Sequence, residues 1–158
     1  MSIWWSLHLR REAASVPLAR RLLLGTMETA GVDPDISFDL SLALSEACAN
    51  AVEHGGYGED SGPSSAAYRV TAYLDGERCR IEVTDSGPGF PARRRRRTAA
   101  VAQLETANEH EHENGRGLGL IQELCDHADF RNRPGSRGAM VRFSKVLKWR
   151  EDALLNAA

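Results

Sequence analysis

A carboxylate and a carboxamide, Glu46 and Asn50, stand four residues apart in a run that favours a helix. This spacing places both side chains on one helix face, with Cβ atoms roughly 5–6 Å apart. Asn offers Mg²⁺ a neutral oxygen ligand, and Glu can orient or deprotonate an attacking hydroxyl group. His54 continues the same face and is a candidate to contact the bound ligand, although a structural role at the end of the helix is an equally good interpretation. The pair predicts a magnesium-phosphate site, and a solvated polar helix face is the alternative.

An aspartate followed by two glycines, Asp85-Ser-Gly87-Pro-Gly89, comes directly after a run that favours a strand. Gly87 and Gly89 allow the backbone to turn sharply and to approach a ligand closely. Asp85, held at the end of the strand, could accept a hydrogen bond from an exocyclic amine. A strand-ending turn without a ligand is the alternative interpretation.

A third stretch, Asn114-Gly-Arg-Gly-Leu-Gly-Leu120, leads straight into a predicted helix. Alternating glycines expose backbone N–H groups, and the helix N-terminus adds a positive dipole, so polyphosphate is the natural ligand. The glycine spacing differs from a Rossmann fingerprint, and no Gly-Lys-Ser/Thr follows as in a P-loop. The candidate binding residues are Gly115, Arg116, Gly117, Leu118 and Gly119.

Hydrophobic periodicity predicts the elements that must position these residues. Residues 3–9 alternate like a strand with one buried face, and residues 15–30 carry apolar side chains at helical spacing. Asp33 and Pro34 open a long helix that ends near His54. The remaining predicted elements are a hairpin of strands 68–74 and 78–84 turning at Asp75-Gly76, a helix over 117–125, and strands over 128–132 and 139–147.

The bulk properties indicate one small domain of a reducing compartment. At 158 residues the chain fits a single core, and its net charge of -2 gives no global attraction to nucleic acid or an anionic membrane. The three cysteines are far apart and form no C-x-x-C pair, which argues against a disulfide framework and a zinc site. No apolar run approaches the ~20 residues that span a bilayer. We therefore expect a cytoplasmic protein with no direct nucleic-acid or membrane partner.

The three motifs are far more specific in combination than alone. The order E-x-x-x-N, D-x-G-x-G and G-x-G-x-G resembles the ATPase superfamily of DNA gyrase, the ninety-kilodalton heat-shock chaperone, the mismatch-repair protein MutL and the histidine kinases, over about residues 30–145. This resemblance implies that Asn50 binds magnesium and that Asp85 recognises the adenine amino group. It also implies that the later glycines close over the phosphates of ATP.

The resemblance implies a fold and a domain plan as well. We expect an α/β (α+β) two-layer sandwich, with a mixed, mostly antiparallel sheet and helices on one face. One ATP-binding, kinase-like domain should cover residues 1–147, with a flexible lid loop at about 90–114. Residues 148–158 should form a C-terminal tail.

The helix sequence Ser45-Glu-Ala-Cys-Ala-Asn-Ala-Val-Glu-His-Gly55 looks like that of the bacterial anti-sigma-factor serine/threonine kinases. At this length we expect neither the dimerising helices of a histidine kinase nor the transducer domain of gyrase. The resemblance implies a homodimer that uses ATP and Mg²⁺, holds a sigma factor inactive, and phosphorylates a serine of a small antagonist protein, with Glu46 as the base. Two alternatives stay open: an ATP-liganded module that sequesters a partner without kinase activity, and an interaction domain that has lost ATP.

Two features depart from the family pattern or fall outside it. The family often places threonine in the last strand as G-T-x-V, whereas Gly138-Ala-Met-Val141 carries no hydroxyl, and Ser136 cannot be assumed to replace it. One lost buried hydrogen bond is worth about 1 kcal/mol, so we expect weaker ATP binding and an unchanged fold. Five arginines, Arg93–Arg97, fall in the expected lid, where a guanidinium could reach a phosphate. A solvated stretch, or a docking patch for an acidic partner, is the favoured interpretation.

Overall fold

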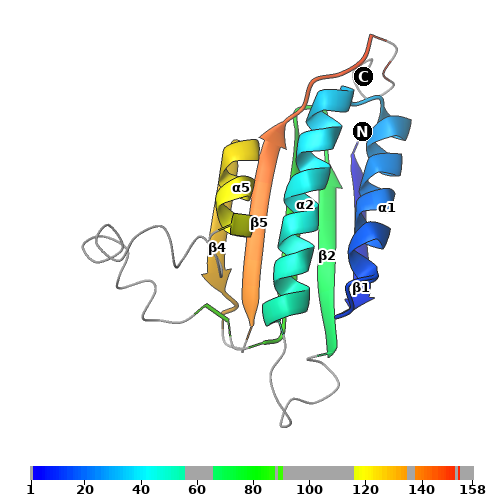
Figure 1. Cartoon of the computed structure of the whole chain (residues 1–158). Coiled ribbons are helices and arrows are strands. Elements are labelled where there is room, and N and C mark those ends of the chain that lie inside the picture. The colour runs from blue at the N-terminus through cyan, green and yellow to red at the C-terminus, as the bar shows by residue number, and fades with distance from the viewer. Residues whose placement is uncertain are drawn as a thin grey trace, which may run out of the picture.

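Five strands form one sheet in the computed structural model, and helices cover one of its faces (Figure 1). The structure describes residues 2–55, 66–87, 89–90, 116–134, 138–151 and 153. Every predicted helix and strand is present, with ends displaced by at most one residue. In chain order the elements are β1 (Ile3–Arg10), α1 (Ser15–Ala30), α2 (Pro34–His54), β2 (Ala67–Leu74), β3 (Arg78–Asp85), α5 (Arg116–Leu124), β4 (His127–Asn132) and β5 (Ala139–Val146).

The strand order is β1-β2-β3-β5-β4, and all four described strand pairs are antiparallel. The predicted two-layer sandwich is confirmed, but the expectation of a mixed sheet is not met by these pairs. The position of β5 in the sheet explains why no parallel pair is seen among these strands. Strands β3 and β4 run in the same direction, yet β5 lies between them and pairs with each in the antiparallel sense. As a result β3 and β4 end at the same edge of the sheet, where β5 begins.

Local signals in the sequence fix the ends of the two long helices. Asp33 caps α2, because its side chain accepts a hydrogen bond from the N–H of Asp35 at 2.8 Å, and Pro34 occupies the first turn. Helix α1 ends at Gly31, which adopts the left-handed conformation with a φ of 89°. Among the described residues, no helix is both long and apolar enough to cross a bilayer.

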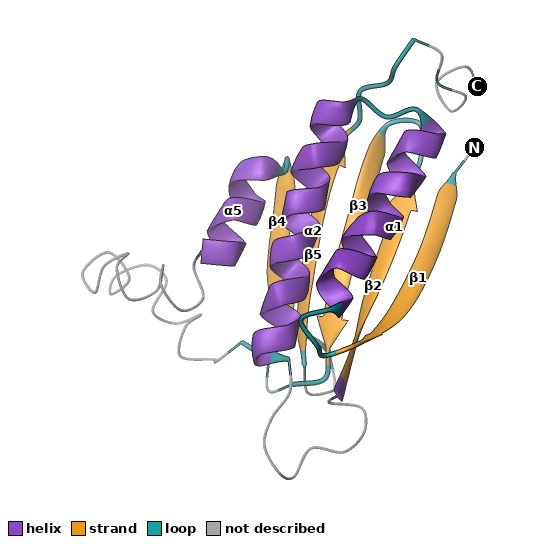
Figure 2. Ribbon diagram, turned by 45° about the vertical axis from the view of Figure 1, so that its right-hand side comes forward, coloured by secondary structure: helices purple, strands orange, loops and turns teal. Residues whose placement is uncertain are grey.

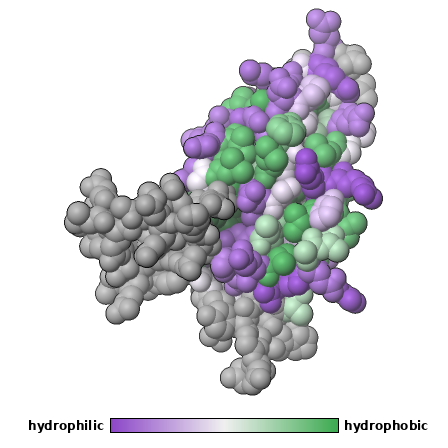
Figure 3. Space-filling model, in the orientation of Figure 1, coloured by the Kyte–Doolittle hydropathy of each residue, from purple (hydrophilic) through white to green (hydrophobic). Residues whose placement is uncertain are grey.

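The core lies between the helices and one face of the sheet (Figure 2). The apolar face of α2 is buried, as are alternate residues of the central strands. On the outer side of the helix layer, apolar and polar side chains are interspersed (Figure 3). Fully buried core side chains include Leu40, Leu44, Val70, Ile81 and Phe143.

Two of the three cysteines behave as small buried hydrophobic residues. Cys48 and Cys79 are fully buried, whereas Cys125 is half-buried. Burial raises the pKa of Cys48 to about 12, although a hydrogen bond with Tyr68 partly opposes the shift. Burial likewise raises the pKa of Cys79 and brings that of Cys125 to about 12. All three side chains are therefore neutral thiols at physiological pH.

Of the predicted tail over 148–158, residues 148–151 and 153 are described, and they contact the rest of the fold. Trp149 forms an isolated antiparallel bridge with Val32, and its indole N–H donates to the carbonyl oxygen of Gly76 at 3.1 Å. Ala153 is 5% exposed and packs on Gly31, where a Cβ would lie 2.6 Å from its own. Buried apolar surface and satisfied backbone groups fix this segment. Periodicity could not reveal it, because the residues form no regular element.

Candidate functional site

Asp85 is the last residue of β3, and two backbone groups hold its carboxylate. Oδ1 accepts hydrogen bonds from the N–H of Gly87 at 2.9 Å and from the N–H of Ala139 at 3.1 Å. The residue is 6% exposed, and Oδ2 accepts no hydrogen bond from another described residue. A carboxylate oxygen is an acceptor only, so Oδ2 remains able to accept from a ligand N–H such as an exocyclic amine.

Three glycines pack backbone against backbone around Asp85. A Cβ on Gly87 would lie 2.6 Å from the carbonyl carbon of Gly55, and a Cβ on Gly55 would lie 2.8 Å from the Cβ of Asp85. Gly138 has a φ of 134°, and a Cβ there would overlap the carbonyl oxygen of Asp85. Only glycine allows the end of α2, the end of β3 and the start of β5 to meet this closely. Gly87 was predicted to let the backbone approach a ligand, and the approach that the structure describes is to the backbone of α2.

Asn132, at the end of β4, fixes the loop that follows Asp85. Its Oδ1 accepts from the N–H of Phe90 at 2.5 Å, and its Nδ2 donates to the carbonyl oxygen of Phe90 at 3.0 Å. Gly89, in the same loop, adopts the left-handed conformation with a φ of 78°. This agrees with the prediction that Gly89 allows the backbone to turn sharply. Arg133 donates from Nη1 to the carbonyl oxygen of Asp85 at 3.3 Å. Sequence reasoning missed Asn132 and Arg133, because no motif links them to a loop more than forty residues away.

The last turns of α2 bring the predicted polar face toward this edge. Glu46 and Asn50 are half-buried, and neither side chain bonds to another described residue. At a rise of 1.5 Å per residue, Asn50 lies about 7.5 Å along the helix axis from Gly55. Gly55 in turn packs on Asp85. The structure thus brings Asn50 and Asp85 into one region. His54 is exposed, and its Nε2 lies 3.6 Å from a carboxylate oxygen of Glu53.

The described part of the third motif is the first turn of the predicted helix, which begins one residue earlier than expected. Helix α5 begins at Arg116, so Gly117, Leu118 and Gly119 are already helical, and a Cβ on Gly119 would meet nothing within 4 Å. The helix packs beside α2, and its N-terminus faces the edge at which β3 and β4 end (Figure 1). The first N–H groups of a helix have no intrahelical acceptor and attract anions. Gly115 lies outside the described residues.

Comparison with known proteins agrees with this arrangement. The profile of the histidine kinase-like ATPase domain matches residues 9–145. This chain belongs to the histidine kinase-like ATPase domain family. It is 31% identical over 128 residues to the serine-protein kinase RsbW of Bacillus pumilus, covering 81% of this chain and 78% of that protein.

Two further matches extend the family placement. A serine-protein kinase RsbW of Listeria monocytogenes is 33% identical over 90 residues, which cover 57% of this chain and 55% of that protein. The crystal structure of the RsbU and RsbW domains of a Mycobacterium tuberculosis protein superposes with a TM-score of 0.63 at 21% identity. The match covers 93% of this chain and 33% of that one, and it supports the fold alone.

The G-T-x-V pattern, set against Gly138-Ala-Met-Val141, places the missing threonine at residue 139. Ala139 occupies this position, and its N–H donates to the carboxylate of Asp85. The register pairs Thr84 with Met140, so the side chains of Asp85 and Ala139 both face the helix layer. The main chain therefore supplies one contact to Asp85, and a hydroxyl contact from this position is absent.

The residues of the site fit a magnesium ion that is bound mainly through nucleotide phosphates. Among the described residues, no three His, Cys, Asp or Glu side chains gather as a metal site would require. Mg²⁺ bound with a phosphate ligand needs only one or two protein oxygens. The side-chain oxygen of Asn50, which has no described hydrogen-bond partner, can supply one.

Several predicted features fall on residues that the structure leaves undescribed. They are the lid at about 90–114 beyond Phe90, the arginines Arg93–Arg97, and Ser136.

Proposed function

We propose that this chain is an ATP-dependent serine/threonine protein kinase and anti-sigma factor that phosphorylates a small antagonist protein. The observation that carries the proposal is the carboxylate of Asp85, fixed through Oδ1 with Oδ2 left to accept from adenine. The similarity to serine-protein kinases named RsbW supports serine as the residue that receives the phosphoryl group. The resemblance noted in the sequence supports the sigma factor and antagonist as partners, and a homodimer as the assembly.

Each residue of the site has a distinct part in this proposal. Asp85 selects adenine, and the N-terminus of α5 receives the phosphates through its first N–H groups. When bound, Mg²⁺ neutralises charge on the transferring phosphoryl group, and Asn50 would hold it. Glu46 lies one helical turn before Asn50, no other described residue bonds to its carboxylate, and it accepts the proton of the serine hydroxyl.

Replacement of Glu46 by Gln tests the catalytic part of the proposal. Glu46→Gln keeps the size of the side chain but removes the base, so phosphate transfer should fall by about 10²–10⁴-fold while ATP binding persists. Transfer of labelled phosphate to the antagonist and calorimetric ATP titration measure the two quantities. Glu53→Gln, on the same helix and with a side chain 72% exposed, is the matched control and should leave both unchanged.

Two outcomes would redirect the proposal. Equal loss of transfer and ATP binding in Glu46→Gln would remove the base assignment. ATP binding by the unaltered protein without transfer to any antagonist would favour a module that sequesters its partner with ATP as a structural ligand. Because residue 139 has no side-chain hydroxyl to support the adenine contact, the ATP titration is the first measurement.

A further inference from the structure

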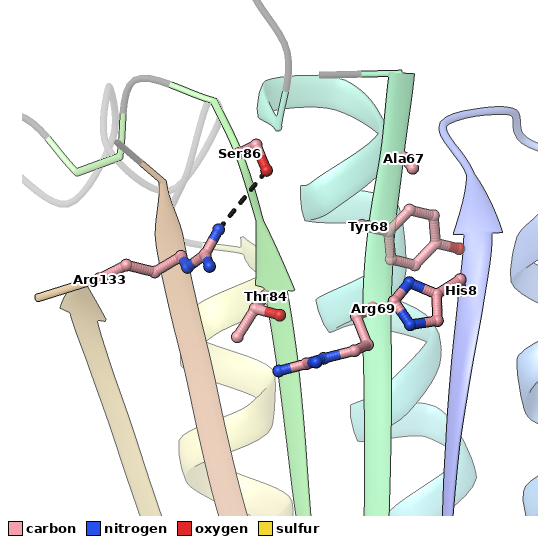
Figure 4. Close-up of a pocket in the computed structure, with 7 residues that line it drawn as sticks. All are labelled: His8, Ala67, Tyr68, Arg69, Thr84, Ser86 and Arg133. Carbon is pink, nitrogen blue, oxygen red and sulfur yellow. Dashed lines mark hydrogen bonds between the residues drawn. The ribbon is translucent and has the colours of Figure 1, made fainter. Parts of the chain in front are cut away.

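A second pocket lies on the face of the sheet that the helices leave uncovered, directly behind the end of β3. It measures about 240 Å³ and is lined by side chains from β1, β2 and β3 and by the residue after β4. Arg69 and Arg133 reach toward Thr84 from opposite sides, and Ser86 lies above it (Figure 4). His8 stands beside Arg69 at the same wall. None of the described residues that line it is acidic.

Other arginines on the same face of the sheet have a charged or aromatic side chain as a partner. Arg142 forms an ion pair with Glu82, and Arg131 forms one with Asp129. Arg80 stacks over a tyrosine ring. Three arginines of this face therefore have a charged or aromatic partner close by.

Neither Arg69 nor Arg133, the two arginines of the pocket, has an acidic partner among the described residues. Arg69 makes no hydrogen bond or ion pair with another described residue. Arg133 bonds only to neutral acceptors, the carbonyl oxygen of Asp85 at 3.3 Å and the hydroxyl of Ser86 at 3.5 Å. Two unneutralised guanidinium groups in one concave site create a local positive potential on a chain whose net charge is -2.

We propose that this pocket binds a small oxyanion of the phosphate class. The planar guanidinium fork matches the geometry of phosphate oxygens, and two such groups from opposite sides can neutralise a dianion. The hydroxyl groups of Thr84 and Ser86 supply neutral donors between them. The pocket is separate from the nucleotide site, because Thr84 and Asp85 point to opposite faces of the same strand.

The position of Arg133 links the two sites physically. Its guanidinium donates to the main chain of Asp85, whose carboxylate faces the other side of the sheet. An oxyanion that draws Arg133 toward itself competes with that hydrogen bond. Any resulting change in ATP affinity must be reciprocal, so that ATP changes oxyanion affinity by the same factor.

Titration of the nucleotide-free protein with sodium phosphate at constant ionic strength tests the proposal. Amide resonances of Arg69, Thr84 and Ser86 should shift together and saturate. Arg69→Gln, which removes no described contact, should weaken the binding about tenfold or more, because charge-assisted hydrogen bonds are lost. Arg133→Gln should do the same while the circular dichroism spectrum stays unchanged. A parallel titration with O-phosphoserine distinguishes the sources: tighter binding than phosphate indicates a carried phosphoryl group, and equal binding indicates the free ion.

Two controls can overturn the proposal. Arg21→Gln, on the exposed side of α1, makes the same charge change far from the pocket and should leave phosphate affinity unaltered. An equal loss in Arg21→Gln and Arg69→Gln, or shifts that never saturate, would show non-specific screening and remove the site. Loss of binding in Asn50→Ala would place the phosphate at the nucleotide site and equally contradict the proposal.

Discussion

The backbone N–H of Ala139 donates a 3.1 Å hydrogen bond to Oδ1 of Asp85, across the junction of β5 and β3. Ala139 occupies the position where the family often carries threonine. The carboxylate is therefore oriented by the main chain even though the side chain at this position has no hydroxyl. The contribution of the main-chain N–H and that of a side-chain hydroxyl at residue 139 can therefore be tested separately.

A hydroxyl restored at this position should strengthen nucleotide binding. Ala139→Thr places an extra donor and acceptor beside Asp85 and should raise ATP affinity about fivefold, the equivalent of one hydrogen bond of ~1 kcal/mol. Calorimetric titration with ATP measures the gain. Ala139→Val has the same shape without the hydroxyl and should show no gain; an equal gain in both variants would attribute the effect to packing.

Asp85→Asn should separate the structural from the recognition role of this side chain. The amide oxygen can still accept from the N–H groups of Gly87 and Ala139, so the fold should persist. The amide nitrogen replaces Oδ2 with a donor that opposes the adenine amino group, and ATP affinity should fall at least tenfold. Competition between ATP and GTP is the measurement, with the preference for ATP expected to narrow. Undiminished ATP binding would remove the adenine contact from the site.

Gly87→Ala should damage the fold and the site together. The new Cβ would lie within 3 Å of the backbone of Gly55, so the end of α2 and the loop after β3 must separate. Overpacking of this kind costs about 1–3 kcal/mol of unfolding free energy, which urea denaturation measures. Gly76→Ala is the matched control, because a Cβ there meets nothing within 4 Å. Equal stability of the two variants would mean that the contact relaxes freely.

Asp75 should make the hairpin between β2 and β3 sensitive to acid. Hydrogen bonds from the N–H groups of Arg78 and Glu77 lower the pKa of Asp75 below its usual 3.8. A lowered folded-state pKa gives stability that is present above the unfolded-state value and is lost as the pH falls through the folded-state value. The stability difference between the unaltered protein and Asp75→Asn should therefore be largest near neutrality and shrink below about pH 3.8. Thermal unfolding across this range is the check, and a constant difference would contradict the charge-based origin.

The sequence by itself determined the elements of this protein and the chemistry of its candidate site. Helix caps such as Asp33, the hairpin turn at Asp75 and the period of each apolar run are local signals, so the ends of helices and strands could be read directly. The side chains of Glu46, Asn50 and Asp85 were identifiable because motif order and residue type carry chemical meaning on their own.

Only the tertiary structure decided how these elements meet. The insertion of β5 between β3 and β4, the contact of Gly55 with Gly87, and the bonds between Asn132 and Phe90 join residues far apart in the chain. The presence of Arg69 and Arg133 in one pocket likewise depends on how the strands are aligned in the sheet. Such contacts leave no periodic trace in the sequence, because they arise from the packing of finished elements. The sequence could therefore name candidate residues for a nucleotide site, whereas the pocket on the opposite face of the sheet could be found only from the fold.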